Sequence, residues 1–173
     1  MERIFIGLAL WNALILGFAG TTGLGWGPAA GHHLIVGLFA AIFSCLVHSI
    51  VMGHLIGAGR AIKEAAVFLD DPDRFLIPNR RLKGRVFPLA TFAPLATVVA
   101  AILGGGVGVG SLPRWAHLGT VILAVVLNFA AYPREIQGIR RTSELIRQIN
   151  LLLQEEEEMK SMIDPAESSG DVR

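Results

Sequence analysis

Apolar residues occur along this chain in four long runs, separated by segments rich in charged residues or in glycine. The runs cover residues 4–19, 33–55, 87–103 and 116–132. They lack the strict alternation of strands and the one-sided 3.6-residue period of surface helices. A helix needs about 20 mainly apolar residues to cross the hydrocarbon layer, because no backbone polar group can stay unpaired in lipid. The pattern therefore predicts an all-α membrane protein, a bundle of four transmembrane helices within residues 1–133.

Basic residues predict which side of the membrane each connection faces. Residues 56–86 and the segment after residue 133 are rich in Arg and Lys, whereas residues 20–32 have neither and residues 104–115 have only Arg114. Short basic connections remain in the cytoplasm. We therefore expect both termini and the 56–86 connection to be cytoplasmic, and the short loops favour a bacterial inner membrane.

The first apolar run has a second interpretation, a cleavable signal peptide after Met1–Arg3. Its charged start is brief, its apolar run is long for a signal, and no clean small-x-small cleavage site follows closely. We therefore favour a retained first span. Cleavage would leave the other three spans in the same orientation.

Helical character is expected to continue beyond the spans. Residues 60–69 extend the second helix into the cytoplasm until Asp70, Asp71 and Pro72 stop it, most simply as a solvated turn. Residues 134–163 predict a cytoplasmic helix that continues the fourth span. Residues 164–173 contain Pro, Ser, Gly and acids, a composition typical of a disordered tail.

A seven-residue repeat marks the predicted cytoplasmic helix. Ile139, Ile146 and Leu153 follow one another at this interval, with Ile149 at an intermediate position. The repeat fits a short coiled coil, but it extends over too few heptads to decide the matter. A helix lying on the membrane surface or against a partner subunit explains it equally well.

Composition adds two constraints. The 173 residues are 53% hydrophobic and carry a net charge of +1, which conceals basic segments near the membrane and an acidic run, Glu155–Glu158, farther out. The basic residues near the membrane mainly set topology, although they can also bind anionic lipid. Cys45 is the only cysteine, so the chain has no internal disulfide and no Cys-rich metal motif. The expected partners are the lipid bilayer and other membrane subunits or a second copy, not nucleic acid.

Histidines in the apolar runs are the sharpest clue to function. Ionisable side chains at membrane depth are costly, so they usually face a bundle interior, a water-filled cavity or a cofactor. His33 and His117 lie near the outer ends of the second and fourth runs and share a level. Two imidazoles at one depth on facing helices are candidate axial ligands of a haem iron. His32 is a substitute for His33, and histidines at this interface can also simply meet water and headgroups.

His48 is deeper, roughly 22 Å from His33 along the helix axis at 1.5 Å per residue. No histidine of another span matches its level, so the chain lacks the two histidine pairs of di-haem membrane cytochromes b. His48 is therefore a haem candidate only as a single ligand or in a haem shared with a partner subunit. We expect a buried hydrogen-bonded cluster of Asn12, His48, Thr97 and Asn128, with proton transfer or quinone binding as alternatives.

No catalytic activity of the chain on its own is expected. The sequence contains no His-Glu-x-x-His pattern and no Gly-x-Ser-x-Gly elbow, and no metal site beyond a haem iron is indicated. The favoured function is an accessory or assembly subunit of a larger membrane complex, with contacts through helix faces and the cytoplasmic tail. The main alternative is a b-type haem electron-transfer subunit that acts with quinone. A weaker one is an oligomeric channel or proton path lined by His48.

Overall fold

The structure, a computed structural model, describes residues 2–26 and 32–163, and within these ranges it contains four α-helices and no strand. The helices are α1 (Glu2–Gly23), α2 (His33–Ala66), α3 (Asp73–Gly108) and α4 (Arg114–Ile163). All four are long and apolar enough to cross a membrane. The all-α class and the four long apolar helices predicted from the sequence are confirmed, and they indicate an integral membrane protein.

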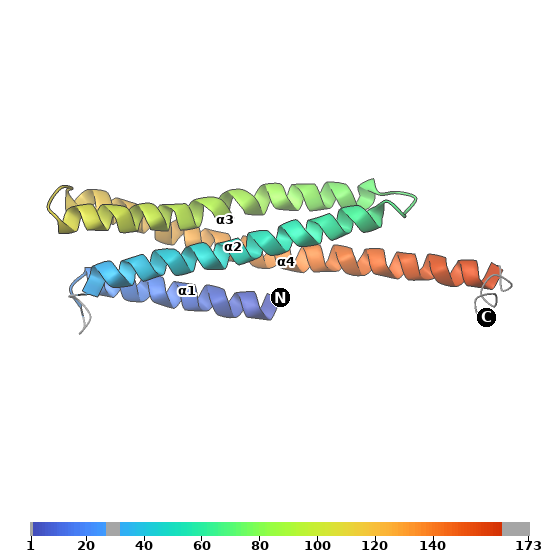
Figure 1. Cartoon of the computed structure of the whole chain (residues 1–173), viewed down its shortest axis with the longest axis horizontal. Helices are drawn as coiled ribbons and strands as arrows, with labels where there is room; N and C mark the ends of the chain where they lie inside the picture. Colours follow the sequence, from blue (N-terminus) through green and yellow to red (C-terminus); the bar gives the residue numbers. More distant parts are fainter. Residues whose placement is uncertain (1, 27–31, 164–173) are drawn as a thin grey trace, which may run out of the picture.

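Successive helices run antiparallel, so the bundle has two distinct ends (Figure 1). We call the end at which α1 and α3 finish and α2 and α4 begin the histidine end, because His33 and His117 lie there. The opposite end, where a short turn joins α2 to α3, is the loop end. The 22 residues of α1 span about 33 Å, close to the thickness of a hydrocarbon core. The other three helices continue past the start of α1 toward the loop end, and α4 extends farthest (Figure 1). The bundle therefore has two parts. The four-helix part lies alongside α1, and the three-helix part, made of α2, α3 and α4, lies between the start of α1 and the loop end (Figure 1).

Helix α3 is much longer than the apolar run that it contains. The sequence predicts a connection over residues 56–86 and a glycine-rich turn over residues 104–115, yet α3 begins at Asp73 and continues to Gly108. Its first turns are helical because Phe75 is buried against α2 and α4 at the loop end. The chain leaves α3 after Gly108 and turns at Gly110, whose φ of +75° allows the amide of Ser111 to bond back to the Gly106 carbonyl.

Two clusters of buried side chains hold the helices together. The first lies within the four-helix part and includes Phe5, Val51, Leu55, Val86 and Ile139. The second lies in the three-helix part and consists of Ile62, Leu69, Phe75 and Ile149, with Ile146 and Leu153 packed against it. The seven-residue repeat of α4 is thus used inside the chain. It packs α4 on its own neighbours, α2 and α3.

Large apolar side chains cover the outside of the four-helix part. Leu14, Ile42, Phe92 and Ile122 are all more than half exposed, and each comes from a different helix. Much of the interior, by contrast, is filled by alanine and by polar side chains. Such an apolar exterior would be an aggregation liability in water and is the pattern expected of a surface that faces lipid.

Replacing Ile149 by Ala tests the packing of α4 at the loop end. Ile149 is 1% exposed, so its truncation leaves a cavity that should lower the free energy of unfolding by about 2–5 kcal/mol. The matched control Leu151→Ala, at a side chain 45% exposed, should change it by less than about 0.5 kcal/mol. Unfolding in a mild detergent, followed by circular dichroism, measures both. Equal losses would contradict the packing of α4 on α2 and α3.

Candidate functional site

Polar side chains from all four helices meet near the middle of α1. Asn128 of α4 is at the centre of this network. Its Nδ2 donates to Thr97 Oγ1 at 3.0 Å and to the carbonyl oxygens of Ala93 and Ala124. Its Oδ1 accepts from the side chains of Asn12, Ser44 and His48. The structure therefore brings together Asn12, His48, Thr97 and Asn128, the four residues expected to form a buried cluster.

The network also contains an acid that the sequence pattern does not place in a span. Glu135 lies beyond the apolar run that ends at residue 132, yet its side chain is fully buried and its Oε1 lies 2.6 Å from His48 Nδ1. The spacing of polar residues along α4 could have predicted that Glu135 is buried. Asn128, Tyr132 and Glu135 follow one another at intervals of four and three residues and so share one face of the helix.

The hydrogen-bond partners of His48 indicate where the protons of the His48–Glu135 pair lie. Because the amide nitrogen of Asn128 already donates to acceptors, its oxygen faces His48 Nε2 at 3.0 Å, which places a proton on Nε2. A second proton lies between His48 Nδ1 and Glu135 Oε1. Whether the imidazole or the carboxyl holds that proton, the pair has no net charge. A neutral total is what burial in a low-dielectric interior favours.

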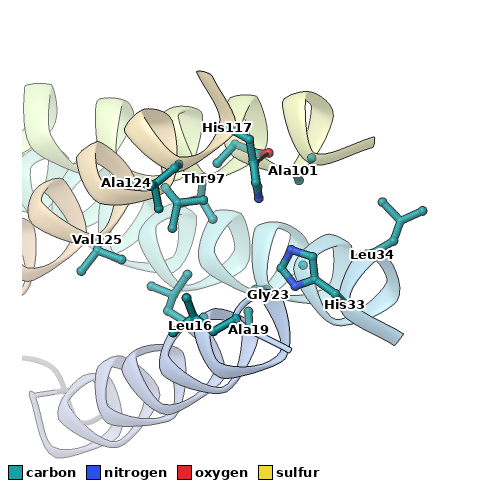
Figure 2. Close-up of a pocket in the computed structure, with 18 of the residues that line it drawn as sticks. Leu16, Ala19, Gly23, His33, Leu34, Thr97, Ala101, His117, Ala124 and Val125 are labelled. Carbon is teal, nitrogen blue, oxygen red and sulfur yellow. Dashed lines mark hydrogen bonds between the residues drawn. The ribbon is translucent and has the colours of Figure 1, made fainter. Parts of the chain in front are cut away.

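A cavity of about 490 Å³ opens between the four helices at the histidine end (Figure 2). Glycine, alanine, leucine and valine make up most of its wall, and its polar side chains are those of His33, His117 and Thr97. The volume lies within the range of roughly 300–1,000 Å³ that small-molecule and cofactor sites occupy. Thr97 also accepts the hydrogen bond from Asn128, so the cavity directly adjoins the buried network.

His33 and His117 reach into this cavity from opposite sides (Figure 2). Their ring centres are 5.9 Å apart, and their planes are inclined by 66°. His117 Nδ1 lies 3.0 Å from the carbonyl oxygen of Ala100, which can only accept, so Nδ1 carries the proton. In the neutral imidazole, Nε2 therefore keeps a free lone pair.

His33 reaches the same state through Thr22. The Thr22 hydroxyl donates to the Ala19 carbonyl oxygen and so accepts from His33 Nδ1, at 3.1 Å. The Nε2 of His33 therefore also keeps its lone pair. A hydrogen bond at one ring nitrogen that fixes the tautomer and the orientation of the other is the usual support of a metal-ligating histidine.

Two glycines give the imidazoles their room. A Cβ atom added at Gly23 would lie 2.7 Å from His33 Cε1, and one added at Gly104 would lie 3.0 Å from His117 Cε1. Real Cβ atoms do not approach as closely as the first distance, so any larger residue at Gly23 would displace the ring. Gly104 is a helical residue of α3, and its missing side chain lets the Cε1 edge of the His117 ring approach the backbone of α3.

The spacing of the two rings suits one shared metal ion. A metal–nitrogen bond to histidine is about 2.0 Å, so two imidazoles on opposite sides of one ion place their ring centres roughly 6 Å apart. The observed separation is 5.9 Å. No group of three or more His, Cys, Asp and Glu side chains that could hold a metal occurs in the described part of the chain. An ion bound here would thus need the rest of its ligands from a cofactor.

The other candidates lie apart from the cavity. His32 is exposed just before α2, and His48 has both ring nitrogens in hydrogen bonds, so neither offers a lone pair to the cavity. Gly53 and Gly57 form a GxxxG motif on α2, and Cβ atoms added at the two glycines would meet no atom within 4 Å. The GxxxG face of α2 is thus not used for packing among the helices of this chain.

No protein-family model, curated protein or solved structure matches the chain. What the site can do must therefore follow from its own residues.

Substitution of Glu135 tests the neutral buried pair. Glu135→Leu leaves His48 without its partner and should lower the free energy of unfolding by about 3–5 kcal/mol. Glu135→Gln should cost about 1 kcal/mol, because its amide can donate to the bare Nδ1 of a neutral imidazole. Glu144→Leu, the same change at a carboxylate outside the network on α4, is the control. Thermal unfolding in detergent measures all three, and equal losses for the Leu and Gln variants at residue 135 would refute the pairing.

Proposed function

We propose that this protein is a b-type haem protein of the membrane, in which His33 and His117 are the two axial ligands, and that it serves as an electron-transfer subunit. The observation that carries the proposal is the pair of imidazoles in one apolar cavity, with ring centres 5.9 Å apart. Both rings keep their Nε2 lone pairs, because both Nδ1 atoms are held by hydrogen bonds.

The wall of the cavity favours haem over a bare metal ion. A hard cation needs several oxygen ligands, and a structural zinc needs four nitrogen or sulfur ligands. The cavity offers two imidazoles and otherwise mainly alkyl groups and glycine. A macrocycle would supply the remaining nitrogen ligands and match the apolar wall. Haem held by ligands from facing helices is an established use of a helical bundle.

Each surrounding residue has a role in this proposal. Thr22 and the Ala100 carbonyl orient the two imidazoles, and Gly23 and Gly104 give them space. Haem would supply a one-electron redox couple. His33 and His117 would hold the iron from both sides and would leave no position for oxygen to bind, which favours electron transfer over oxygen chemistry.

The proposed haem subunit would act together with a quinone or with other subunits of a larger complex. An electron-transfer subunit with one haem needs a donor and an acceptor from outside the chain. Gly53 and Gly57 leave a face of α2 uncovered, and small residues allow a second transmembrane helix to approach closely. Basic residues gather toward the loop end, so we infer that this end is cytoplasmic and that the cavity lies near the outer surface.

Visible spectroscopy tests the proposal. The protein purified in detergent, expressed with ample haem supply, should show sharp b-type bands in a reduced-minus-oxidised spectrum. His33→Ala and His117→Ala should each lower the haem content by about tenfold or more, since losing one metal–ligand bond should cost at least 1.4 kcal/mol of binding. The control His32→Ala alters an exposed neighbour and should keep the spectrum.

Imidazole rescue separates a lost ligand from a lost fold. Free imidazole can enter the space left by either Ala variant and should restore part of the six-coordinate spectrum. A wild-type protein without haem bands, or His variants with unchanged haem content, would overturn the proposal.

A further inference from the structure

Two hollows of opposite character lie between α3 and α4 on the outside of the bundle. The first, about 840 Å³, has four arginines in its wall: Arg85, Arg134, Arg140 and Arg141. The second, about 460 Å³, is lined by apolar side chains and Thr120, with Phe92 and Leu127 from the two facing helices. A strongly basic hollow and an apolar one thus share the same pair of helices.

The lining residues of the two hollows lie on the same faces of α3 and α4, so we treat the two hollows as the two halves of one groove. On α3 the lining residues Leu82, Arg85, Leu89, Phe92, Ala96 and Val99 follow one another at three or four residues. On α4 the residues Leu123, Leu127, Arg134, Gln137, Arg141 and Glu144 follow the same rule, counting two turns between Leu127 and Arg134. Such intervals keep side chains on one face of a helix. The two faces run side by side in opposite directions, basic toward the loop end and apolar toward the histidine end.

The start of α1 sets the depth of this groove in the membrane. Arg140 Nη2 lies 2.6 Å from Glu2 Oε1, so the basic part of the groove is level with the first residue of α1. Because α1 is about as long as the hydrocarbon core is thick, its start lies near the membrane surface. The basic part is therefore at headgroup level, and the apolar part is at the level of acyl chains.

Three of the four arginines, all but Arg140, keep their charge available for a ligand. Among the described residues, Arg85 and Arg141 make no hydrogen bond or ion pair with another side chain, and Arg134 donates only to the Ala130 carbonyl. Glu144 is the one acid in this wall. Hydrogen bonds from Arg147 and then Gln148 hold the pKa of the Glu144 carboxyl below its usual range, so its charge is already paired.

We propose that this groove binds one anionic glycerophospholipid from the leaflet at the loop end. Its phosphate contacts Arg85, Arg134 and Arg141, and an acyl chain lies over Leu89, Phe92 and Ala96. Basic pockets between transmembrane helices at headgroup level suit such lipids. A soluble phosphate would use the arginines and leave the apolar half of the groove without a role.

Native mass spectrometry of the full chain, released from nanodiscs of mixed phosphatidylcholine and phosphatidylglycerol, tests the proposal. The expected result is a one-to-one adduct enriched in phosphatidylglycerol. Each arginine near an anionic lipid contributes about 1 kcal/mol, or roughly fivefold in affinity, so Arg85→Gln/Arg134→Gln/Arg141→Gln should weaken retention roughly one hundredfold. The control Arg74→Gln/Arg80→Gln/Arg81→Gln removes equal charge from α3 outside the groove and should keep the adduct.

A second variant distinguishes a whole lipid from its headgroup alone. Ala96→Trp fills the apolar half and should lower phosphatidylglycerol retention while leaving the arginines in place. Free glycerol phosphate should not compete the adduct away. Equal retention of both lipids, equal loss in the control, or an adduct insensitive to Ala96→Trp would overturn the proposal. Haem content is measured on the same samples, so failure here is separable from failure at the histidine cavity.

Discussion

Hydrogen bonds that converge on the Asn128 side chain of α4 connect it to the other three helices. Its amide meets Thr97 of α3, Asn12 of α1 and both Ser44 and His48 of α2. In lipid the hydrophobic effect does little to bring helices together, so buried polar contacts and close packing decide which faces meet. Shifting any helix by one turn would leave several of these buried groups unpaired, at about 1–3 kcal/mol for each group. The network therefore fixes the register of all four helices at once, and both the cavity and the outer groove depend on that register.

The His48–Glu135 pair shows how an ionisable group can be kept at membrane depth. Burial of one charge without the other would be prohibitive, whereas an acid and a base that share one proton stay neutral in total. Both residues are fully buried, and both ring nitrogens of His48 are bonded inside the bundle. In this fold His48 thus faces the hydrogen-bonded network inside the bundle. Thr97 links this network to the cavity wall, so electrostatic changes in the cavity have a short hydrogen-bonded connection to a buried proton.

The two proposed sites lie in different places: the cavity with the histidines is inside the bundle, and the groove with the arginines is on its outside. Inside, Gly23 and Gly104 let two imidazoles lie against helix backbones, which leaves an apolar chamber with two lone pairs. Outside, the same antiparallel α3–α4 pair presents arginines at headgroup level and alkyl groups below them. The proposed haem and lipid sites use different faces and different chemistry. They share the architecture because both need helices held at a fixed register across the membrane.

Hydropathy along the sequence was enough to indicate an integral membrane protein with four long apolar helices, because each run is long and apolar enough for a helix that crosses lipid. The sequence also predicted the polar cluster of Asn12, His48, Thr97 and Asn128, because each lies deep in an apolar run. Only the tertiary structure showed Glu135 in that network, since a carboxylate past the end of an apolar run looks solvent-exposed until its partner is known. Likewise, the helical start of α3 depends on the burial of Phe75, and the use of the α4 repeat depends on neighbours distant in sequence. Hydropathy reports how much each residue avoids water, but which residues face one another is decided by the packing and hydrogen bonds between helices.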